Sequence, residues 1–279
     1  MESMLTSQQV AHFKTFGFLI IRGLFSPDEM AMIKHESDEI FEEERGGTPF
    51  LGENWEAVQP FFERRPFMSG LAEDDRIYGI ATALCGPNFV LDGTEGNLHV
   101  GETAWHSSKP EGLYKTSAQG HSFTGYGEFS LPNVKITFYP EPTTMDTGCL
   151  RVVPGSHTAV SPDFLELLRT NNQDPEFRPF GVLPSEIPAY SFESQPGDVM
   201  VFTESVIHAA FGGGKGRQQH AISFFADPRS KEEETLIRRL YERSKYSYRP
   251  AMSYIDSDSP RIRRMVSRLV EWGFSPLPF

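Results

Sequence analysis

With 279 residues, of which 38% are hydrophobic and 23% charged, the chain has the composition of a globular protein and not of a disordered one. Its formal net charge of −12 argues against a nucleic-acid-binding role, which a basic surface would serve. Since no run approaches the roughly 18 uncharged apolar residues of a spanning helix, we expect neither nucleic acid nor membrane as a partner.

Cysteine content and the first residues bear on the cellular location. Cys85 and Cys149 are too few for a disulfide framework, so a reducing compartment is the simpler assumption. The sequence starts without the basic segment and apolar run that a signal peptide shows. We therefore expect a cytoplasmic protein.

Residues 1–88 are expected to form helices and the first strands. Serine caps mark the starts of two helices, Gly17 and Gly86-Pro87 mark the ends of the first and third, and an apolar run marks one strand. The helices are expected over residues 8–16, with Ser7 as N-cap, and over 27–43 and 67–85, and the strand over 18–21.

Residues 89–228 change to short β-rich runs between turn signals, which is typical of an antiparallel sandwich or barrel. The clearest runs are 97–100, 134–139, 150–153, 199–203 and 221–225. Residues 229–279 look helical again and form a C-terminal extension. Because this extension is too short to bury a core alone, we expect one domain over residues 1–279.

Two of the eight histidines stand at the ends of predicted strands. His106 follows Trp105 directly after one strand, and His208 ends an apolar strand that begins at a Pro-Gly-Asp turn. Arg217 comes nine residues after His208, beyond a glycine-rich turn. A lone buried histidine is usually a hydrogen-bonded core residue. The informative feature is the two histidines together, with an arginine following.

These motifs, with the turn at residues 150–157 (LRVVPGSH) between them, resemble the phytanoyl-CoA dioxygenase family of Fe(II)/2-oxoglutarate-dependent oxygenases over roughly residues 7–228. The resemblance implies a mainly β fold with flanking helices around a double-stranded β-helix (jelly-roll, cupin-like) core. It also implies an oxidoreductase that uses Fe(II), 2-oxoglutarate and O₂ to oxidise an unactivated C–H bond of a small molecule. By resemblance, His106 and His208 hold iron, and Arg217 binds the distal carboxylate of 2-oxoglutarate.

Position 108 departs from the family's pattern, which has a metal-binding carboxylate where this chain has Ser108. A neutral hydroxyl is a poor iron ligand. The replacement therefore leaves one coordination position of the iron open and removes one negative charge from the site. The arrangement is similar to that of halogenases in this superfamily, where chloride or bromide takes the open position. We therefore expect halogenation, with Ser108 beside the open position and hydroxylation as the alternative.

Other interpretations stand beside this one. A different carboxylate could complete the metal site, the candidates being Glu102, Asp146 and Glu204. Extended geometry disfavours Glu102, because it would lie about 13 Å from His106. The chain could also be a non-catalytic, cupin-like binding protein that lost its metal together with the carboxylate, or Ser108 could replace a native aspartate.

Further residues are expected around the site. Asn97 lies on a strand that leads to it and is a candidate second contact for 2-oxoglutarate. His99 either lines the same pocket or packs in the core, and Asp198 is expected to cap backbone N–H groups in its turn. The candidate pocket walls, for each of which a place in the core is the alternative, are Trp105, Phe123, Tyr126 and Phe138.

Overall fold

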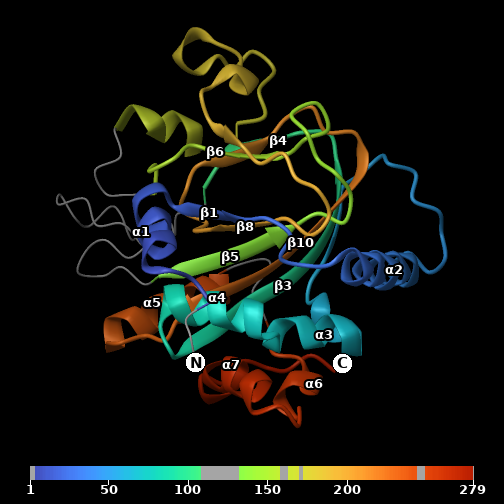
Figure 1. Cartoon of the computed structure of the whole chain (residues 1–279), viewed down its shortest axis with the longest axis vertical. Helices are drawn as coiled ribbons and strands as arrows, with labels where there is room; N and C mark the ends of the chain where they lie inside the picture. The colour runs from blue at the N-terminus through green and yellow to red at the C-terminus, as the bar shows by residue number, and fades with distance from the viewer. Residues whose placement is uncertain (1–3, 108–131, 158–162, 170–171, 244–248, 279) are drawn as a thin grey trace.

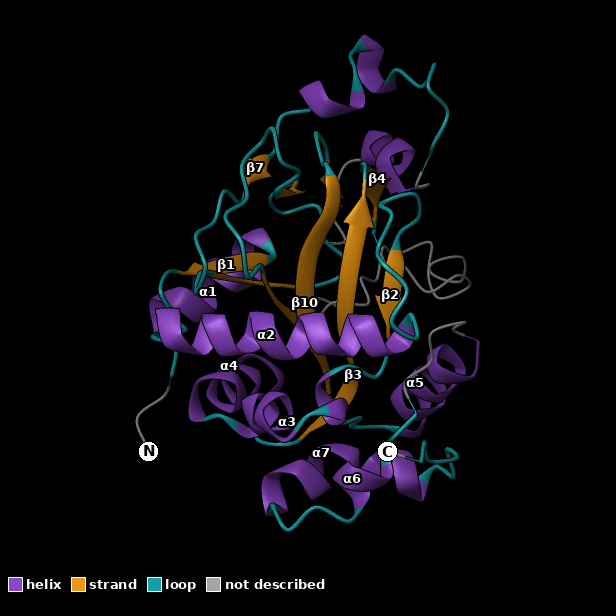
Figure 2. Ribbon diagram, turned by 90° about the vertical axis from the view of Figure 1, so that its right-hand side faces the viewer, coloured by secondary structure: helices purple, strands orange, loops and turns teal. Residues whose placement is uncertain are grey.

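The computed structural model describes residues 4–107, 132–157, 163–169, 172–243 and 249–278 (Figure 1). Ser108, Phe123 and Tyr126 lie outside the described residues. Two antiparallel sheets face each other, and helices pack on the outer face of the larger sheet (Figures 1 and 2). This arrangement confirms the predicted mainly β, jelly-roll architecture.

The larger sheet is built from strands that are distant in sequence. Its spatial order is β1 (Phe18–Ile21), β8 (Val199–Phe202), β5 (Asn133–Phe138), β10 (Lys215–Ala226), β3 (Phe89–Val100) and β2 (Glu56–Val58). Strands β3 and β10 are longer than predicted, because they pair along almost their whole length. That ladder holds positions with weak β propensity, such as Gly93 and Gln218, in extended conformation.

The smaller sheet lies opposite and carries the predicted histidines. Its order is β4 (Thr103–His106), β9 (His208–Ala210), β6 (Leu150–Val152) and β7 (Tyr190–Ser191). Short 3₁₀ segments follow along the chain at η2 (Asp163–Arg169), η3 (Pro179–Gly181) and η4 (Pro184–Glu186).

The helices correct two sequence predictions. The first helix is capped by Thr6 and not by Ser7, because Thr6 and Gln9 form a reciprocal capping box. The stretch predicted as one helix over 67–85 is divided at Asp74, whose side chain caps the second part. The helices are α1 (Ser7–Phe16), α2 (Pro27–Glu44), α3 (Pro66–Glu73), α4 (Asp75–Cys85), α5 (Lys231–Arg243), α6 (Met252–Ile255) and α7 (Pro260–Glu271), with η1 (Phe62–Arg64) before α3.

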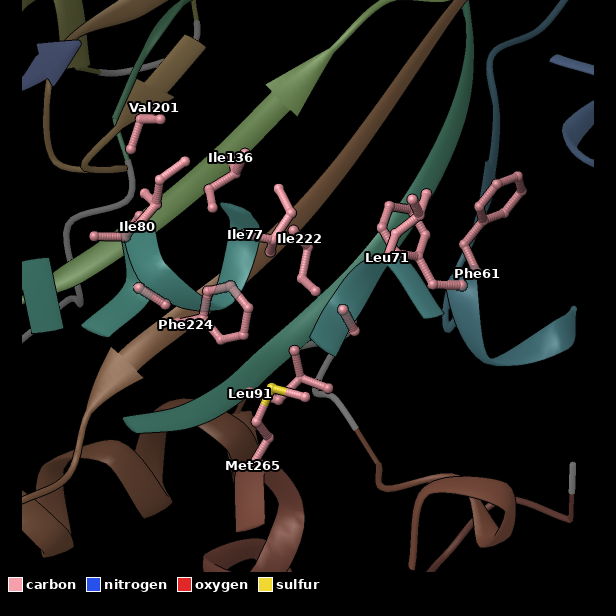
Figure 3. Packing of buried hydrophobic residues seen from close by; sticks show 14 of the residues in the cluster. Phe61, Leu71, Ile77, Ile80, Leu91, Ile136, Val201, Ile222, Phe224 and Met265 are labelled. Atoms are coloured by element: carbon pink, nitrogen blue, oxygen red, sulfur yellow. The ribbon is translucent and has the colours of Figure 1, made fainter. Parts of the chain in front are cut away.

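The main hydrophobic core lies between the larger sheet and the helices. Figure 3 shows Ile136, Ile222 and Phe224 of the sheet packed towards side chains of α4 and α7. The same cluster includes Leu5 near one end of the chain and Leu269 near the other. This shared core supports our proposal that the chain is one domain, with a C-terminal helical extension over 229–279.

The inner face of the larger sheet, which is turned towards the smaller sheet, has a different character. Because side chains alternate along a strand, every second residue of β3, β5 and β10 points to this face. One end of the space between the sheets is filled by an apolar cluster that includes Phe18, Val152 and Phe202.

In the part of the chain that the structure describes, no helix is both long enough and apolar enough to cross a membrane.

Candidate active site

His106 and His208 lie side by side. They are cross-strand partners on β4 and β9, and their ring centroids are 4.1 Å apart. The Nδ1 atom of His106 lies 2.8 Å from the carbonyl oxygen of Ala104, and that of His208 lies 2.8 Å from the oxygen of Val206. Since a carbonyl only accepts, each Nδ1 donates a proton, and each Nε2 carries a free lone pair.

Burial keeps both rings neutral. It is the main cause that lowers the pKa of His106, and it lowers the pKa of His208 well below the usual value, with a further contribution from His106. Neither Nε2 atom has a hydrogen-bond partner among the described residues. A neutral imidazole whose Nδ1–H is held by a carbonyl is the usual metal-binding form of histidine. The pair therefore fits a divalent cation such as Fe(II).

No third ligand joins the pair within the described part of the chain. No group of three or more His, Cys, Asp or Glu side chains is placed there to hold a metal. Glu102 instead accepts a hydrogen bond from the backbone N–H of Gly212, and Glu204 pairs with Lys135. The carboxylates considered as substitutes for residue 108 thus do not complete a triad, and Ser108 itself lies outside the described residues.

Arg217 provides a cationic group on the inner face of β10. Its Nη1 makes one long contact of 3.5 Å to the carbonyl of Thr147, and its Nε is buried without a hydrogen-bond partner among the described residues. A Cβ atom at Gly148 or Gly213 would collide with the guanidinium, so these glycines make its position possible. A guanidinium with unused donors suits a carboxylate.

A hydrogen-bonded group surrounds Asn97 next to this arginine. Asn97 is buried, accepts a hydrogen bond from Trp55 Nε1 at 3.2 Å, and donates to Gln219 Oε1 at 3.3 Å. His99 is the cross-strand partner of Arg217 and donates from Nε2 to the same Gln219 oxygen at 2.9 Å. These contacts place Asn97 and His99 on the inner face, beside Arg217.

His99 is held neutral in this setting. Burial, aided by the charge of Arg217, lowers the pKa of His99 to about 4, and its ring stacks on Trp55 with centroids 5.8 Å apart. Trp55 and Gln219 were missed by sequence reasoning. The signal for Gln219 was present, since it lies two residues after Arg217 on a strand and must share its face.

A partly buried ionic cluster is the second feature that the sequence did not reveal. The ammonium of Lys135 on β5 pairs with Glu95 on β3 and, at 3.2 Å, with Glu204 after β8. Gln59 also donates to Glu95, at 2.9 Å. The available signal was Lys135 itself, a charged residue in the otherwise uncharged strand β5.

Two predicted pocket walls lie elsewhere. Trp105 alternates with His106 on β4 and points to the outer face, where it packs with Leu168 and Phe211 and donates to the carbonyl of Pro184. Phe138 packs on the helix side of the larger sheet, where its ring lies 5.1 Å from that of Phe25. Both are core residues, the alternative reading given above; Phe123 and Tyr126 lie outside the described residues.

Comparison with known proteins identifies the family. The family model described as phytanoyl-CoA dioxygenase (PhyH) matches residues 13–218, which is well over half of the chain. The chain belongs to the phytanoyl-CoA dioxygenase family. The resemblance in the sequence motifs is thereby confirmed. The chain is a 2-oxoglutarate-dependent, non-haem iron enzyme of this family. No curated protein matches the chain.

Solved structures show the same fold at low sequence identity. The carbocyclase SnoK from nogalamycin biosynthesis aligns with a TM-score of 0.57 at 18% identity, covering 84% of this chain and 90% of its own. HygX from Streptomyces hygroscopicus, with nickel and 2-oxoglutarate bound, aligns with a TM-score of 0.57 at 21% identity. The alignment covers 81% of this chain and 88% of HygX. EctD from S. alaskensis, with 2-oxoglutarate and 5-hydroxyectoine, aligns with a TM-score of 0.57 at 18% identity. The alignment covers 81% of this chain and 77% of EctD.

Proposed function

We propose that the enzyme oxidises an unactivated C–H bond of a small-molecule substrate, with Fe(II) bound by His106 and His208 and 2-oxoglutarate bound by Arg217 and Asn97. The observation that carries the proposal is the contact between two neutral imidazoles whose Nε2 lone pairs are unused. The iron bound in HygX, the 2-oxoglutarate bound in HygX and EctD, and the 5-hydroxyectoine bound in EctD support the choice of metal, cosubstrate and a small polar substrate.

The residues of the chain have separate tasks in this proposal. The carbonyls of Ala104 and Val206 fix the imidazole orientation, and Arg217 offers paired donors to the distal carboxylate of 2-oxoglutarate. Trp55 and Gln219 hold the Asn97 amide, so its orientation is set before the cosubstrate arrives. Bound Fe(II), with 2-oxoglutarate and O₂, supplies oxidation of the C–H bond coupled to formation of succinate and CO₂.

Two reactions are candidates for this enzyme, halogenation and hydroxylation of the substrate. Ser108 favours halogenation, because chloride or bromide could take the position and charge that a carboxylate would otherwise fill. Hydroxylation is the second candidate, and it is supported by Lys135 with its two carboxylates, whose net negative charge disfavours a halide nearby. Both candidates use the same histidines and arginine.

Crystals of the enzyme grown without oxygen, with Fe(II), 2-oxoglutarate and bromide, test this division. We expect anomalous bromide scattering within metal-ligand distance of the His106–His208 pair if the enzyme halogenates, and none in a Ser108→Asp crystal. A water at that position, together with succinate formation that does not depend on chloride or bromide, would instead assign hydroxylation. Absence of both metal binding and succinate formation would point to a cupin-like binding protein and overturn the proposal.

The cellular location is part of the same proposal. Both thiols, Cys85 and Cys149, are buried and unpaired. Free thiols in these positions are compatible with a reducing compartment, so we propose a cytoplasmic enzyme.

A further inference from the structure

The ionic cluster of Glu95, Lys135 and Glu204 lies on the inner face of the larger sheet, within the jelly roll. Each of the three side chains is at most 20% exposed. Small residues on β10 make the arrangement possible: Ala221 pairs with Glu95, and Ser223 pairs with Lys135, so the ammonium can reach across β10 to the carboxylate. The cluster is therefore a built feature of the sheet and not a surface ion pair.

The cluster also lies next to the two histidines. Lys135 is the cross-strand partner of Phe202, and the Phe202 ring contacts the His208 ring at a centroid distance of 5.2 Å. Glu204 follows Phe202 by two residues. Because alternate residues of a strand share a face, Lys135, Phe202 and Glu204 lie on the inner side, next to the His208 ring.

Lys135 and Glu95 both keep their charges despite burial. Burial opposes the charge of Lys135, but the two carboxylates raise the pKa of Lys135 above its usual value. Burial likewise opposes ionisation of Glu95, yet the charge of Lys135 and hydrogen bonds that include Gln59 keep the pKa of Glu95 below its usual value. Two carboxylates and one ammonium give the cluster a net charge of −1.

We propose that this cluster sets the charge of the two-histidine centre: its net −1 stands in for the metal-binding carboxylate that Ser108 lacks, and Glu204 keeps the Lys135 ammonium from repelling the cation. The inference rests on the proposed function, since it assumes a metal at His106 and His208. It assigns Glu95, Lys135 and Glu204 a role as positioning residues for charge. None of them is a ligand, which agrees with the absence of a third ligand among the described residues.

Electrostatics explains why the sign of each charge matters here. A charge inside the jelly roll is less screened from a cation at the two histidines than a charge in water would be, because an effective dielectric constant near 20 applies instead of about 80. Loss of Glu204 would leave Lys135 paired with one carboxylate and a cluster of zero net charge. Loss of Lys135 would leave two carboxylates. Loss of both restores the original net charge.

Metal affinity of the full-length protein tests the proposal without any substrate. Calorimetric titration with Co(II), with 2-oxoglutarate present, would compare wild type with Glu204→Gln, Lys135→Met and the double variant. We expect Glu204→Gln to weaken binding roughly tenfold to a hundredfold and Lys135→Met to strengthen it by a similar factor. The double variant is expected to bind within about threefold of wild type, because its cluster again carries one negative charge.

Two further variants keep the outcome clear. Glu204→Asp retains the charge and is expected to bind like wild type, even if Lys135→Met fails to fold. Glu42→Gln, an exposed carboxylate on α2, is the matched control and should have no effect. Unchanged affinity in Glu204→Gln, or a double variant as weak as Glu204→Gln, overturns the inference alone. Wild type that binds no Co(II), or Co(II) affinity that is unchanged in His208→Ala, overturns the proposed function instead.

Discussion

His106 and His208 face each other across neighbouring antiparallel strands, and each ring is fixed by the carbonyl two residues before it in the chain. The same local device thus orients both rings, although 101 residues separate them in sequence (208 − 106 − 1). This repetition supports the proposed metal site, since both Nε2 atoms remain available while both Nδ1 atoms are satisfied.

Removal of either imidazole should strongly weaken metal binding. His208→Ala leaves one described ligand, and we expect the Co(II) dissociation constant to rise by at least about a hundredfold, beyond the 10–100-fold typical for loss of a supporting contact. Calorimetric titration measures this. His35→Ala, an exposed histidine on α2, serves as control. Equal affinity in His208→Ala and wild type would contradict the assignment.

Arg217 should govern affinity for 2-oxoglutarate. Arg217→Ala removes the paired donors, and loss of hydrogen bonds to a charged group costs about 1.5–3 kcal/mol, so we expect roughly tenfold to hundredfold weaker binding. Arg217→Lys keeps the charge without the planar fork and should give an intermediate value. Titration of the Co(II)-loaded protein with 2-oxoglutarate measures the effect, with the exposed Arg178→Ala as control. A wild-type constant for Arg217→Ala would refute this role.

Asp198 should stabilise the turn before β8, as the sequence predicted. Its carboxylate accepts hydrogen bonds from the backbone N–H groups of Gly23 and Gln195, each at 3.0 Å, and from Arg22 at 2.7 Å. We expect Asp198→Ala to lower the free energy of unfolding by about 2–3 kcal/mol, near 1 kcal/mol for each bond. Urea denaturation at pH 7 measures this, and a loss below about 0.5 kcal/mol would contradict it.

The same carboxylate predicts a pH dependence. Burial opposes ionisation, but the hydrogen bonds from Gln195, Arg22 and Gly23 lower the pKa of Asp198 below its usual value. The ionised Asp198 side chain therefore makes its full contribution to the free energy of unfolding above its pKa in the unfolded chain, about 3.9. This contribution is lost as the pH falls through the lower pKa of the folded protein. The difference in stability between wild type and Asp198→Ala should shrink only in that acidic range. A difference that already disappears near pH 6 would be inconsistent with this cause.

His220 on the helix side of β10 predicts a second, separate pH effect. It is fully buried, stacks on Phe61 at 5.1 Å and lies 3.2 Å from Ser37 Oγ, while its Nδ1 has no hydrogen-bond partner among the described residues. Burial lowers the pKa of His220 to about 3. Since the folded state binds fewer protons than the unfolded one, stability decreases as pH falls from about 6.5 towards this value.

His220→Phe keeps the ring and removes the titration. Between pH 7 and pH 5 we expect the variant to lose about 2 kcal/mol less stability than wild type. Urea denaturation at both pH values measures the difference, and His35→Phe on the surface of α2 controls for loss of a histidine. Parallel pH profiles for His220→Phe and wild type would show that His220 does not cause the effect.

The sequence by itself determined the family, the jelly-roll class and the identity of the two histidines and the arginine that we propose as the site. Local signals sufficed for this, because the motifs stand at strand ends and turns whose residues are set by backbone geometry. The start of the first helix was misplaced by one residue, because Thr6 and Ser7 are both acceptable N-cap residues. Asp198 was assigned correctly because a turn's own backbone supplies part of its partners.

Only the tertiary structure decided which side chains share the space between the sheets. Trp105 and Phe138 are aromatic, as pocket walls often are, but the alternation of side chains along a strand points them away from the space between the sheets. The cluster around Lys135 needed the order β8-β5-β10-β3, since its members come from strands far apart in the chain. Which strands neighbour one another depends on the packing of the whole sheet, and no local pattern in the sequence encodes it.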